Sequence, residues 1–311
     1  MKYKIVAPIQ QGNQVVFTFA ETPRKITFDY IRAVNSPKHF LLPNRDIILK
    51  WKFQNSTIAL EQPKIEEKYA FIGLHPCDAN AIAVLDKVML EEPIDPYYHA
   101  RRRNSLIIVV DCIESDDYCF CESVNARTPW EGVYDLWLVP LSEGYAITYG
   151  SDEGIKIIKQ LGLSETTPPK IRRGINKRRM PSIDLKAFEK LYDHVVWSRL
   201  SDDCLLCGSC MAACPTCTCF DVVDEVNLDL SEGKRVRIWD SCIFRVFTMV
   251  AGGRVVRREP VDRFKHRYYH KFLYFKERYG IYGCTGCGRC VSSCPRHIDP
   301  INVITEVMKN V

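Results

Sequence analysis

Hydrophobic residues in the first half of the chain come in short runs between polar positions, which is typical of β-strands. The two most apolar runs are Tyr69–Leu74 and Ser105–Val110, and residues 79–90 between them have helical spacing. We therefore predict a βαβ unit with two parallel, buried strands. Further short strands are predicted at 5–7, 15–19, 26–30, 47–51, 133–141 and 145–149.

The second half changes to helical periodicity. Apolar residues recur at helical spacing over 184–200, and residues 261–278 interleave aromatic with basic side chains. We interpret the rings as packing groups and the charges as solvent-exposed or facing a partner. Binding of single-stranded nucleic acid is a remote alternative, since it uses the same two residue types.

These patterns predict an α+β fold with two domains, which 311 residues can accommodate. Residues 1–165 form a mixed α/β domain, and 184–311 form a mainly helical, ferredoxin-like domain with a long insertion at 220–283. Residues 166–183, which are rich in lysine and arginine, are interpreted as a solvated linker.

The composition indicates the cellular compartment in which the protein works. The chain has 15 cysteines, a net charge of +5 and no apolar run long enough for a signal peptide or a membrane span. Without a secretory signal, so many cysteines indicate a reducing compartment, where disulfides are rare. We expect a cytoplasmic protein whose cysteines bind metal.

The cysteine spacing in the second half predicts two cubane clusters. The run C-x2-C-x2-C-x3-C-P of bacterial ferredoxins occurs twice, beginning at Cys204 and at Cys284. In such runs three cysteines hold one cluster, and the fourth, which has entered a helix, ligates the other. The predicted ligand sets are Cys284, Cys287, Cys290 and Cys214 for one 4Fe-4S cluster, and Cys204, Cys207, Cys210 and Cys294 for the other.

Other interpretations of these cysteines are weaker. Zinc ribbons separate their two C-x2-C pairs by a dozen or more residues. Cys210, Cys214 and Cys217 also match the spacing of radical enzymes that use S-adenosylmethionine, but the chain after Cys217 is too short for their barrel. The backbone amides of Gly208, Gly283, Gly286 and Gly288 are candidate hydrogen-bond donors to sulfur, since glycine permits close approach.

A third 4Fe-4S cluster is predicted in the first domain. Cys77 and Cys112 follow the carboxyl ends of the two buried strands, where open α/β sheets bind ligands. Cys119 and Cys121 in the next loop complete four thiolates. His75 is interpreted as a structural residue. Three cysteines stay unassigned, either as additional metal ligands, as shields or as inert residues: Cys217, Cys219 and Cys242.

Motifs of catalysis are missing from the sequence. It contains no G-x-G-x-x-G fingerprint, P-loop, haem attachment motif or H-E-x-x-H helix. The chain therefore has redox centres without a recognisable substrate site. We predict a non-catalytic protein that transfers electrons between partners.

Five segments of the sequence carry a resemblance to a known family: 75–78, 117–121, 214–219, 226–229 and 239–242. Together they resemble the beta, iron-sulfur subunit of cytoplasmic sulfhydrogenases and are similar to the electron-transfer subunit of anaerobic sulfite reductases. The resemblance covers nearly the whole chain. It implies a protein with several cubane clusters, bound by the eight ferredoxin cysteines and by the four cysteines of the first domain.

The resemblance also implies partners. One is a flavin subunit that exchanges electrons with NAD(P)H. The other is the catalytic part of the complex. In sulfhydrogenases this part consists of a hydrogenase small subunit and a nickel-iron subunit. In anaerobic sulfite reductases it is a sirohaem subunit, and this is the alternative expectation.

Overall fold

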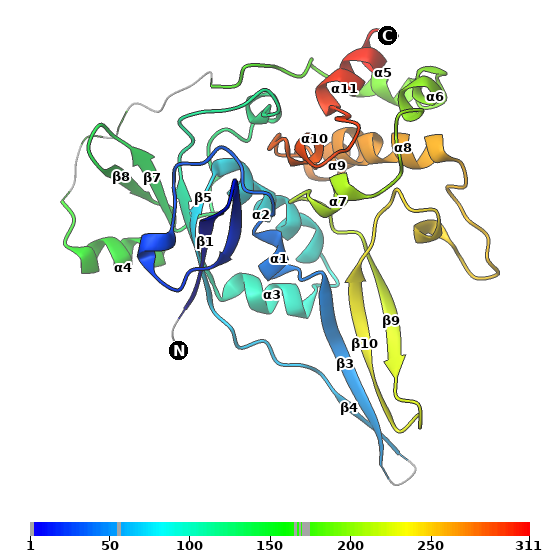
Figure 1. Cartoon of the computed structure of the whole chain (residues 1–311), viewed down its shortest axis with the longest axis horizontal. Helices are drawn as coiled ribbons and strands as arrows, with labels where there is room; N and C mark the ends of the chain where they lie inside the picture. The colour runs from blue at the N-terminus through cyan, green and yellow to red at the C-terminus, as the bar shows by residue number, and fades with distance from the viewer. Residues whose placement is uncertain (1–2, 55–56, 165–166, 168, 170–174) are drawn as a thin grey trace.

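The computed structural model describes residues 3–54, 57–164, 167, 169 and 175–311 (Figure 1). It confirms the α+β class, with a sheet covered by helices in the N-terminal part and a mainly helical C-terminal part. Seven of the 18 residues of the predicted linker lie outside the described residues. Its described end is only partly solvated: Lys177 and Arg179 are exposed, but Met180 and Ile183 are buried in the C-terminal core.

A six-stranded sheet forms the N-terminal part, in the order β2-β1-β5-β6-β7-β8. The four inner strands are parallel and the two outer pairs are antiparallel. The predicted strand at 26–30 is wrong, because this segment makes only one bridge, between Ile26 and Ile9. The strands are β1 (Lys4–Gln11), β2 (Gln14–Phe19), β5 (Tyr69–Leu74), β6 (Ser105–Val110), β7 (Leu136–Pro140) and β8 (Tyr145–Tyr149).

The predicted βαβ unit is confirmed. Helix α2 (Pro76–Met89) leaves the carboxyl end of β5 and, with α3 (Pro96–Arg103), leads to the parallel strand β6. Phe71, Leu85 and Ile107 are fully buried between sheet and helix. Cys77 and Cys112 therefore start from neighbouring strand ends at one edge of the sheet. Two further helices, α1 (Lys38–Leu41) and α4 (Asp152–Leu161), complete this part.

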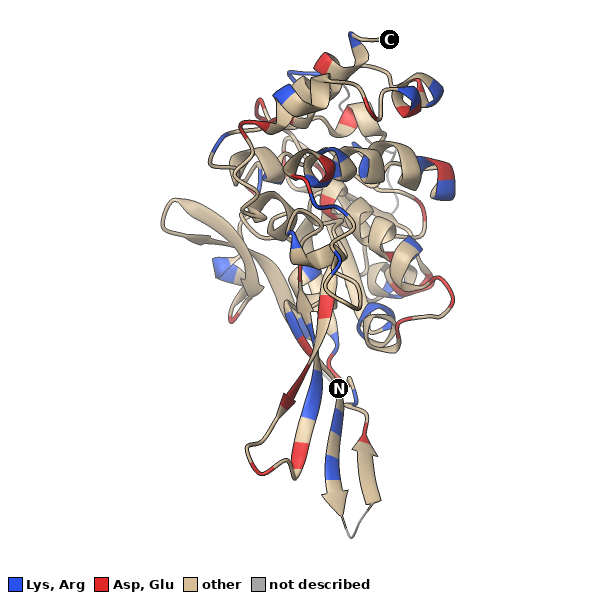
Figure 2. Ribbon diagram, turned by 90° about the vertical axis from the view of Figure 1, so that its right-hand side faces the viewer, with Lys and Arg blue, Asp and Glu red and all other residues tan. Residues whose placement is uncertain are grey.

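A second sheet joins the two parts of the chain. Its order is β4-β3-β10-β9, with β3 (Arg45–Gln54) and β4 (Thr57–Glu61) from the N-terminal part. The other two strands, β9 (Phe220–Val226) and β10 (Glu232–Trp239), belong to the insertion. Figure 1 shows this sheet extending away from the rest of the molecule, and charges of both signs lie along its strands (Figure 2). The sequence predicted only β3.

The helical part packs around Trp197, Phe264 and Tyr268, which are at most 2% exposed. The helix predicted at 261–278 is confirmed and is continuous, with a π-helical segment at His270–Tyr274. The helix predicted at 184–200 is instead two short helices. The elements are α5 (Leu185–Lys190), α6 (Val196–Ser201), α7 (Ser209–Ala212), α8 (Pro260–Tyr269), α9 (Phe275–Tyr279), α10 (Arg289–Ser292) and α11 (Pro300–Met308).

The second ferredoxin run packs directly on the N-terminal part. The Arg289 side chain is 1% exposed, forms an ion pair of 2.5 Å with Asp78 and donates to the carbonyl of Ala33 at 2.8 Å. Gly286 has a φ of +64°, and a Cβ there would lie 2.5 Å from the backbone nitrogen of Cys121. Only glycine allows this approach.

Candidate iron-sulfur sites

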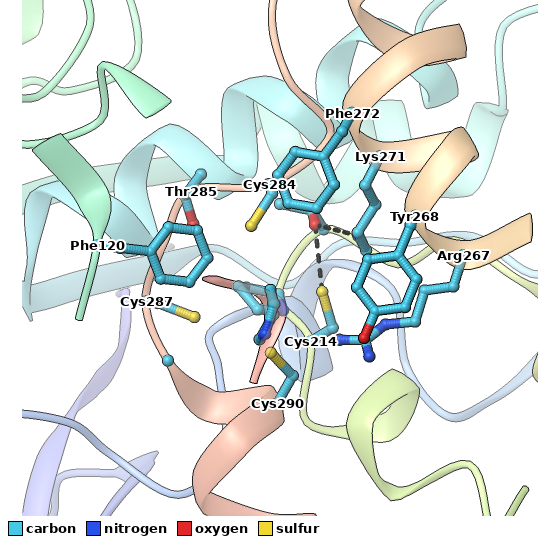
Figure 3. Close-up of a pocket in the computed structure, with 14 residues that line it drawn as sticks. Phe120, Cys214, Arg267, Tyr268, Lys271, Phe272, Cys284, Thr285, Cys287 and Cys290 are labelled. Carbon is cyan, nitrogen blue, oxygen red and sulfur yellow. Dashed lines mark hydrogen bonds between the residues drawn. The ribbon is translucent and has the colours of Figure 1, made fainter. Parts of the chain in front are cut away.

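Twelve of the cysteines surround three cavities in sets of four. The first site is lined by Cys214, Cys284, Cys287 and Cys290 (Figure 3). The second is lined by Cys204, Cys207, Cys210 and Cys294, and the third by Cys77, Cys112, Cys119 and Cys121. These are the sets that the sequence predicts, including the exchange of the fourth ferredoxin cysteine. Their role as ligands remains a prediction.

The loops of the first and second sites explain how the cysteines converge. Helices α7 and α10 begin directly after Gly208 and Gly288, which have φ angles of +77° and +74°. Each short helix carries one cysteine at its second position, while the earlier cysteines stay in the loop. The amide of Gly286 donates to the sulfur of Cys284 at 3.4 Å, as predicted, whereas the amide of Gly283 donates to the carbonyl of Lys271 at 2.8 Å, so the prediction for Gly283 is wrong.

The first site is a buried, largely apolar cavity. Phe120, Tyr268 and Phe272 form its walls together with Arg267 and Lys271 (Figure 3). Burial raises the pKa of Cys284 and Cys290 to about 12, although Lys271 and Arg267 respectively oppose this effect. As free thiols these two cysteines therefore stay protonated near pH 7, and a bound cation is needed to deprotonate them.

Three polar atoms at the first site have no hydrogen-bond partner within the described residues. They are Nε of Arg267, Oη of Tyr268 and Oγ1 of Thr285. Buried donors without acceptors are costly and rare in folded proteins. The sulfur atoms of a cluster would accept these hydrogen bonds, so the donor set fits the predicted cofactor.

Buried positive charge also fits a cluster. Arg267 and Lys271 are 7% and 6% exposed, and no carboxylate in the described part of the chain lies within ion-pair distance of either. A buried cation requires an anion. Clusters held by thiolates are anionic, so these two side chains suit the site. The sequence interpretation, which placed the charges of this helix in solvent or against a partner, was wrong for Arg267 and Lys271.

The second site lies nearer the surface. Cys207 is exposed, and hydrogen bonds from the hydroxyl and amide of Ser209 lower the pKa of its thiol. Leu205, Ile243 and Phe264 supply apolar walls. Arg267 and Cys290 line both this cavity and that of the first site. The two sites therefore share a wall.

The third site lies at the edge of the six-stranded sheet. The guanidinium of Arg32 lies 3.6 Å from the sulfur of Cys119 and also donates to Asp116 and to the carbonyl of Cys287. Asn176 lies 3.5 Å from the sulfur of Cys121, and its Nδ2 has no partner within the described residues. Cys287 lines both the third and the first cavity. The sites are thus arranged in the order third, first, second.

His75 lines the third cavity but packs as a structural residue. Its ring is 3% exposed and stacks on that of Tyr30 with 4.0 Å between centroids. Burial lowers the pKa of His75 to about 4, so the ring is neutral near pH 7. The stacking supports the structural interpretation of this histidine.

Arg267, Lys271 and Arg32 are the site residues that sequence analysis missed. Arg267 and Lys271 are four residues apart on one helix, which places them on one face. The sequence did indicate that this face is buried, since it also carries aromatic residues. The sequence alone did not show what the face packs against, which is both ferredoxin runs.

Comparisons with known proteins agree with this geometry. Residues 203–298 match the family described as 4Fe-4S dicluster domain, so this part of the chain is an iron-sulfur domain of the two-cluster type. The chain is also similar to sulfhydrogenase 2 subunit beta of Pyrococcus furiosus, with 32% identity over 99% of this chain and 93% of that protein. The chain belongs to the sulfhydrogenase beta-subunit family.

Two further comparisons are negative. No solved structure matches the chain. Within the described residues, none of the helices has the length and apolar character needed to cross a bilayer.

The position of Arg267 between two sites gives a prediction for reduction potentials. Replacing Arg267 with leucine is expected to lower the potentials of the first and second clusters by roughly 50–100 mV. A unit charge about 7 Å away stabilises an added electron by about 2 kcal/mol at an effective dielectric constant of 20. Redox titration followed by electron paramagnetic resonance measures both. Arg278→Leu, which removes an exposed cation from the same helical run, is the control. Equal potentials in the two variants would exclude this role.

Proposed function

We propose that this chain is a non-catalytic electron-transfer subunit of a hydrogenase-type complex. It connects a flavin subunit that exchanges electrons with NAD(P)H to the hydrogenase small subunit with its nickel-iron subunit. The observation that carries the proposal is the shared walls of the three cysteine sites, through Cys287 and through Cys290 with Arg267. Family membership supports the type of complex.

When bound, 4Fe-4S clusters supply reversible one-electron transfer. The protein itself holds the clusters in series and excludes water from the first site, which lies in the middle of the series. The first site is buried under Phe120, Tyr268 and Phe272, whereas the second and third sites approach the surface at Cys207 and Ile31. Electrons would therefore enter and leave at the two ends of the series.

A reconstitution experiment tests this function. We expect hydrogen-dependent reduction of NAD(P)+ only when this chain is mixed with the flavin subunit and the two hydrogenase subunits. Each partner alone should keep its own half-reaction with an artificial dye. Full coupled turnover without this chain would contradict the proposal. Coupling to a sirohaem subunit with sulfite, but not to the hydrogenase subunits, would instead support the sulfite reductase alternative.

A further inference from the structure

An ordered loop beside the second site exposes both positive charge and apolar side chains. Residues 244–258, which we name the arginine loop, connect β10 to α8 and project from the molecule on the side away from the six-stranded sheet (Figure 1). Met249 pairs with Val255, and the chain turns at Gly252 and Gly253, whose φ angles are +83° and +77°. The backbone of the loop therefore has a defined shape.

Arg263 of α8 anchors the arginine loop at both ends. This residue is 5% exposed, and its guanidinium donates to the carbonyl of Ile243 at 2.9 Å and to that of Arg257 at 3.2 Å. Ile243 lines the cavity of the second site. A Cβ on Gly208 would lie 2.6 Å from the ring of Phe244, so this ring rests on the first ferredoxin run.

The arginine loop exposes large apolar side chains to solvent. Five of them are between 37% and 62% exposed: Phe244, Val246, Met249, Val250 and Val256. Leu205, which lines the second cavity together with Ile243, is also 62% exposed. Exposed apolar side chains gathered in one place mark interaction sites, and phenylalanine, methionine and arginine are enriched in protein interfaces.

The charge of the arginine loop is positive and unbalanced. The loop contains four arginines and no acidic residue: Arg245, Arg254, Arg257 and Arg258. Within the described residues none of the four forms an ion pair, and Nε of Arg257 is buried without a hydrogen-bond partner. Residues 240–259, which include the flanking Asp240 and Glu259, still carry a net charge of +2 from four arginines and two acids. The surface suits a negatively charged partner.

The projecting second sheet differs from the arginine loop in this respect. It also has exposed apolar residues, such as Leu60 at 66%. Its charges, however, pair within the sheet, as in Lys50 with Glu61 at 3.2 Å and Arg235 with Asp224 at 2.7 Å. Only the loop therefore combines exposed apolar side chains with unpaired charge of one sign next to a cysteine site.

We propose that the arginine loop is the docking surface for an acidic partner protein that exchanges electrons with the second cluster. The apolar side chains form the centre of the interface and the arginines its charged rim. Cys207 of the second site is exposed and lines one open cavity together with Phe244, so the site opens beside the loop. In each transfer one electron passes between the two redox centres, and no bond is formed or broken. That the partner is a subunit of the complex rests on the proposed function.

Two other anionic partners fit this surface less well. Binding of single-stranded nucleic acid uses aromatic stacking, whereas the exposed apolar residues of the loop other than Phe244 are aliphatic. An anionic membrane would attract the same arginines but offers no redox centre to the second site. An acidic protein with a redox centre of its own accounts for the charge, the apolar side chains and the position of Cys207 together.

Electron transfer from reduced plant-type ferredoxin, a small acidic protein with a 2Fe-2S cluster, tests the docking surface on the full cluster-loaded chain. Each ferredoxin gives one electron to the chain, and freeze-quench electron paramagnetic resonance follows the loss of its own signal. We expect the rate constant to fall about tenfold between roughly 20 and 300 mM salt, because salt screens the attraction. At low salt, Arg245→Glu combined with Arg254→Glu should lower it by about tenfold.

The matched control is Arg24→Glu combined with Arg103→Glu. Both arginines are exposed, belong to the N-terminal part and line none of the three cysteine cavities. The control changes the net charge of the chain by the same amount, and its rate constant should stay within about twofold of the wild-type value. Equal iron content in the three proteins separates a loss of docking from a loss of the second cluster.

Three results would overturn the proposal. The first is no electron transfer from ferredoxin to the wild-type chain, and the second is equal rate constants for the loop variant and the control. The third is binding to vesicles of anionic lipid that requires the loop arginines while the reaction with ferredoxin does not. Failure of the proposed function would differ from these, because coupled turnover would then proceed without this chain, whereas the ferredoxin reaction involves no partner subunit.

Discussion

Replacing Cys207 with serine is expected to lower electron transfer between the hydrogenase subunits and the flavin subunit by more than tenfold. Serine is a poor ligand for a cluster that thiolates hold, so the second site should lose its cluster, or about four irons per chain. Cys207 is exposed, and its loss leaves no cavity in the core. Hydrogen-dependent NAD(P)+ reduction by the assembled complex measures the effect, with each partner's half-reaction followed separately.

The control for this variant is Val195→Ser. Val195 is 74% exposed and lines none of the three cysteine cavities, so the change to serine there removes no ligand. It should keep both iron and coupled turnover. Full turnover of Cys207→Ser with the physiological partners, despite the missing irons, would show that electrons do not pass through the second site.

Arg289→Met is expected to destabilise the protein by about 3–5 kcal/mol, because it leaves the Asp78 carboxylate buried without its partner. Both side chains of this ion pair are at most 2% exposed. The pair joins the second ferredoxin run to helix α2, one residue after Cys77. We therefore expect loss of the third cluster along with the lower stability, measured by thermal unfolding and by iron content.

Arg296→Met provides the matched comparison. Arg296 forms an ion pair of 2.7 Å with Asp203, but the two side chains are 53% and 67% exposed. Exposed pairs contribute about 0–1 kcal/mol, so this variant should behave like wild type. A second test is Asp78→Leu combined with Arg289→Met, which removes both charges and should recover part of the stability. Equal melting temperatures for Arg289→Met and Arg296→Met would contradict the role of the buried pair.

Local features of the fold follow from the sequence because they depend on neighbouring residues. The apolar runs of β5 and β6 and the helical spacing between them are sufficient to predict a parallel pair, and the ferredoxin spacing is sufficient to group Cys214 with the second run. The sheet that β3 forms with β10 could not be predicted. Its strands are far apart in sequence, and each mixes charged with apolar residues, so neither has the apolar run of a buried strand.

The buried charges around the sites show a second limit of prediction from sequence. Lysine and arginine are mostly exposed in proteins, and this is a sound expectation for a helix considered alone. Arg267 and Lys271 depart from it because the thiol sites supply the anion that makes burial tolerable. Such a departure becomes visible only when both ferredoxin runs are placed against the helix.

The central claim is that this chain carries clusters in series, and metal analysis with electron paramagnetic resonance on anaerobically purified protein tests it most directly. The account predicts iron and acid-labile sulfide in equal amounts, about 12 of each per chain. It also predicts spectral broadening from magnetic coupling between neighbouring reduced clusters. About eight irons or fewer, bound zinc, or clusters without mutual coupling would contradict it.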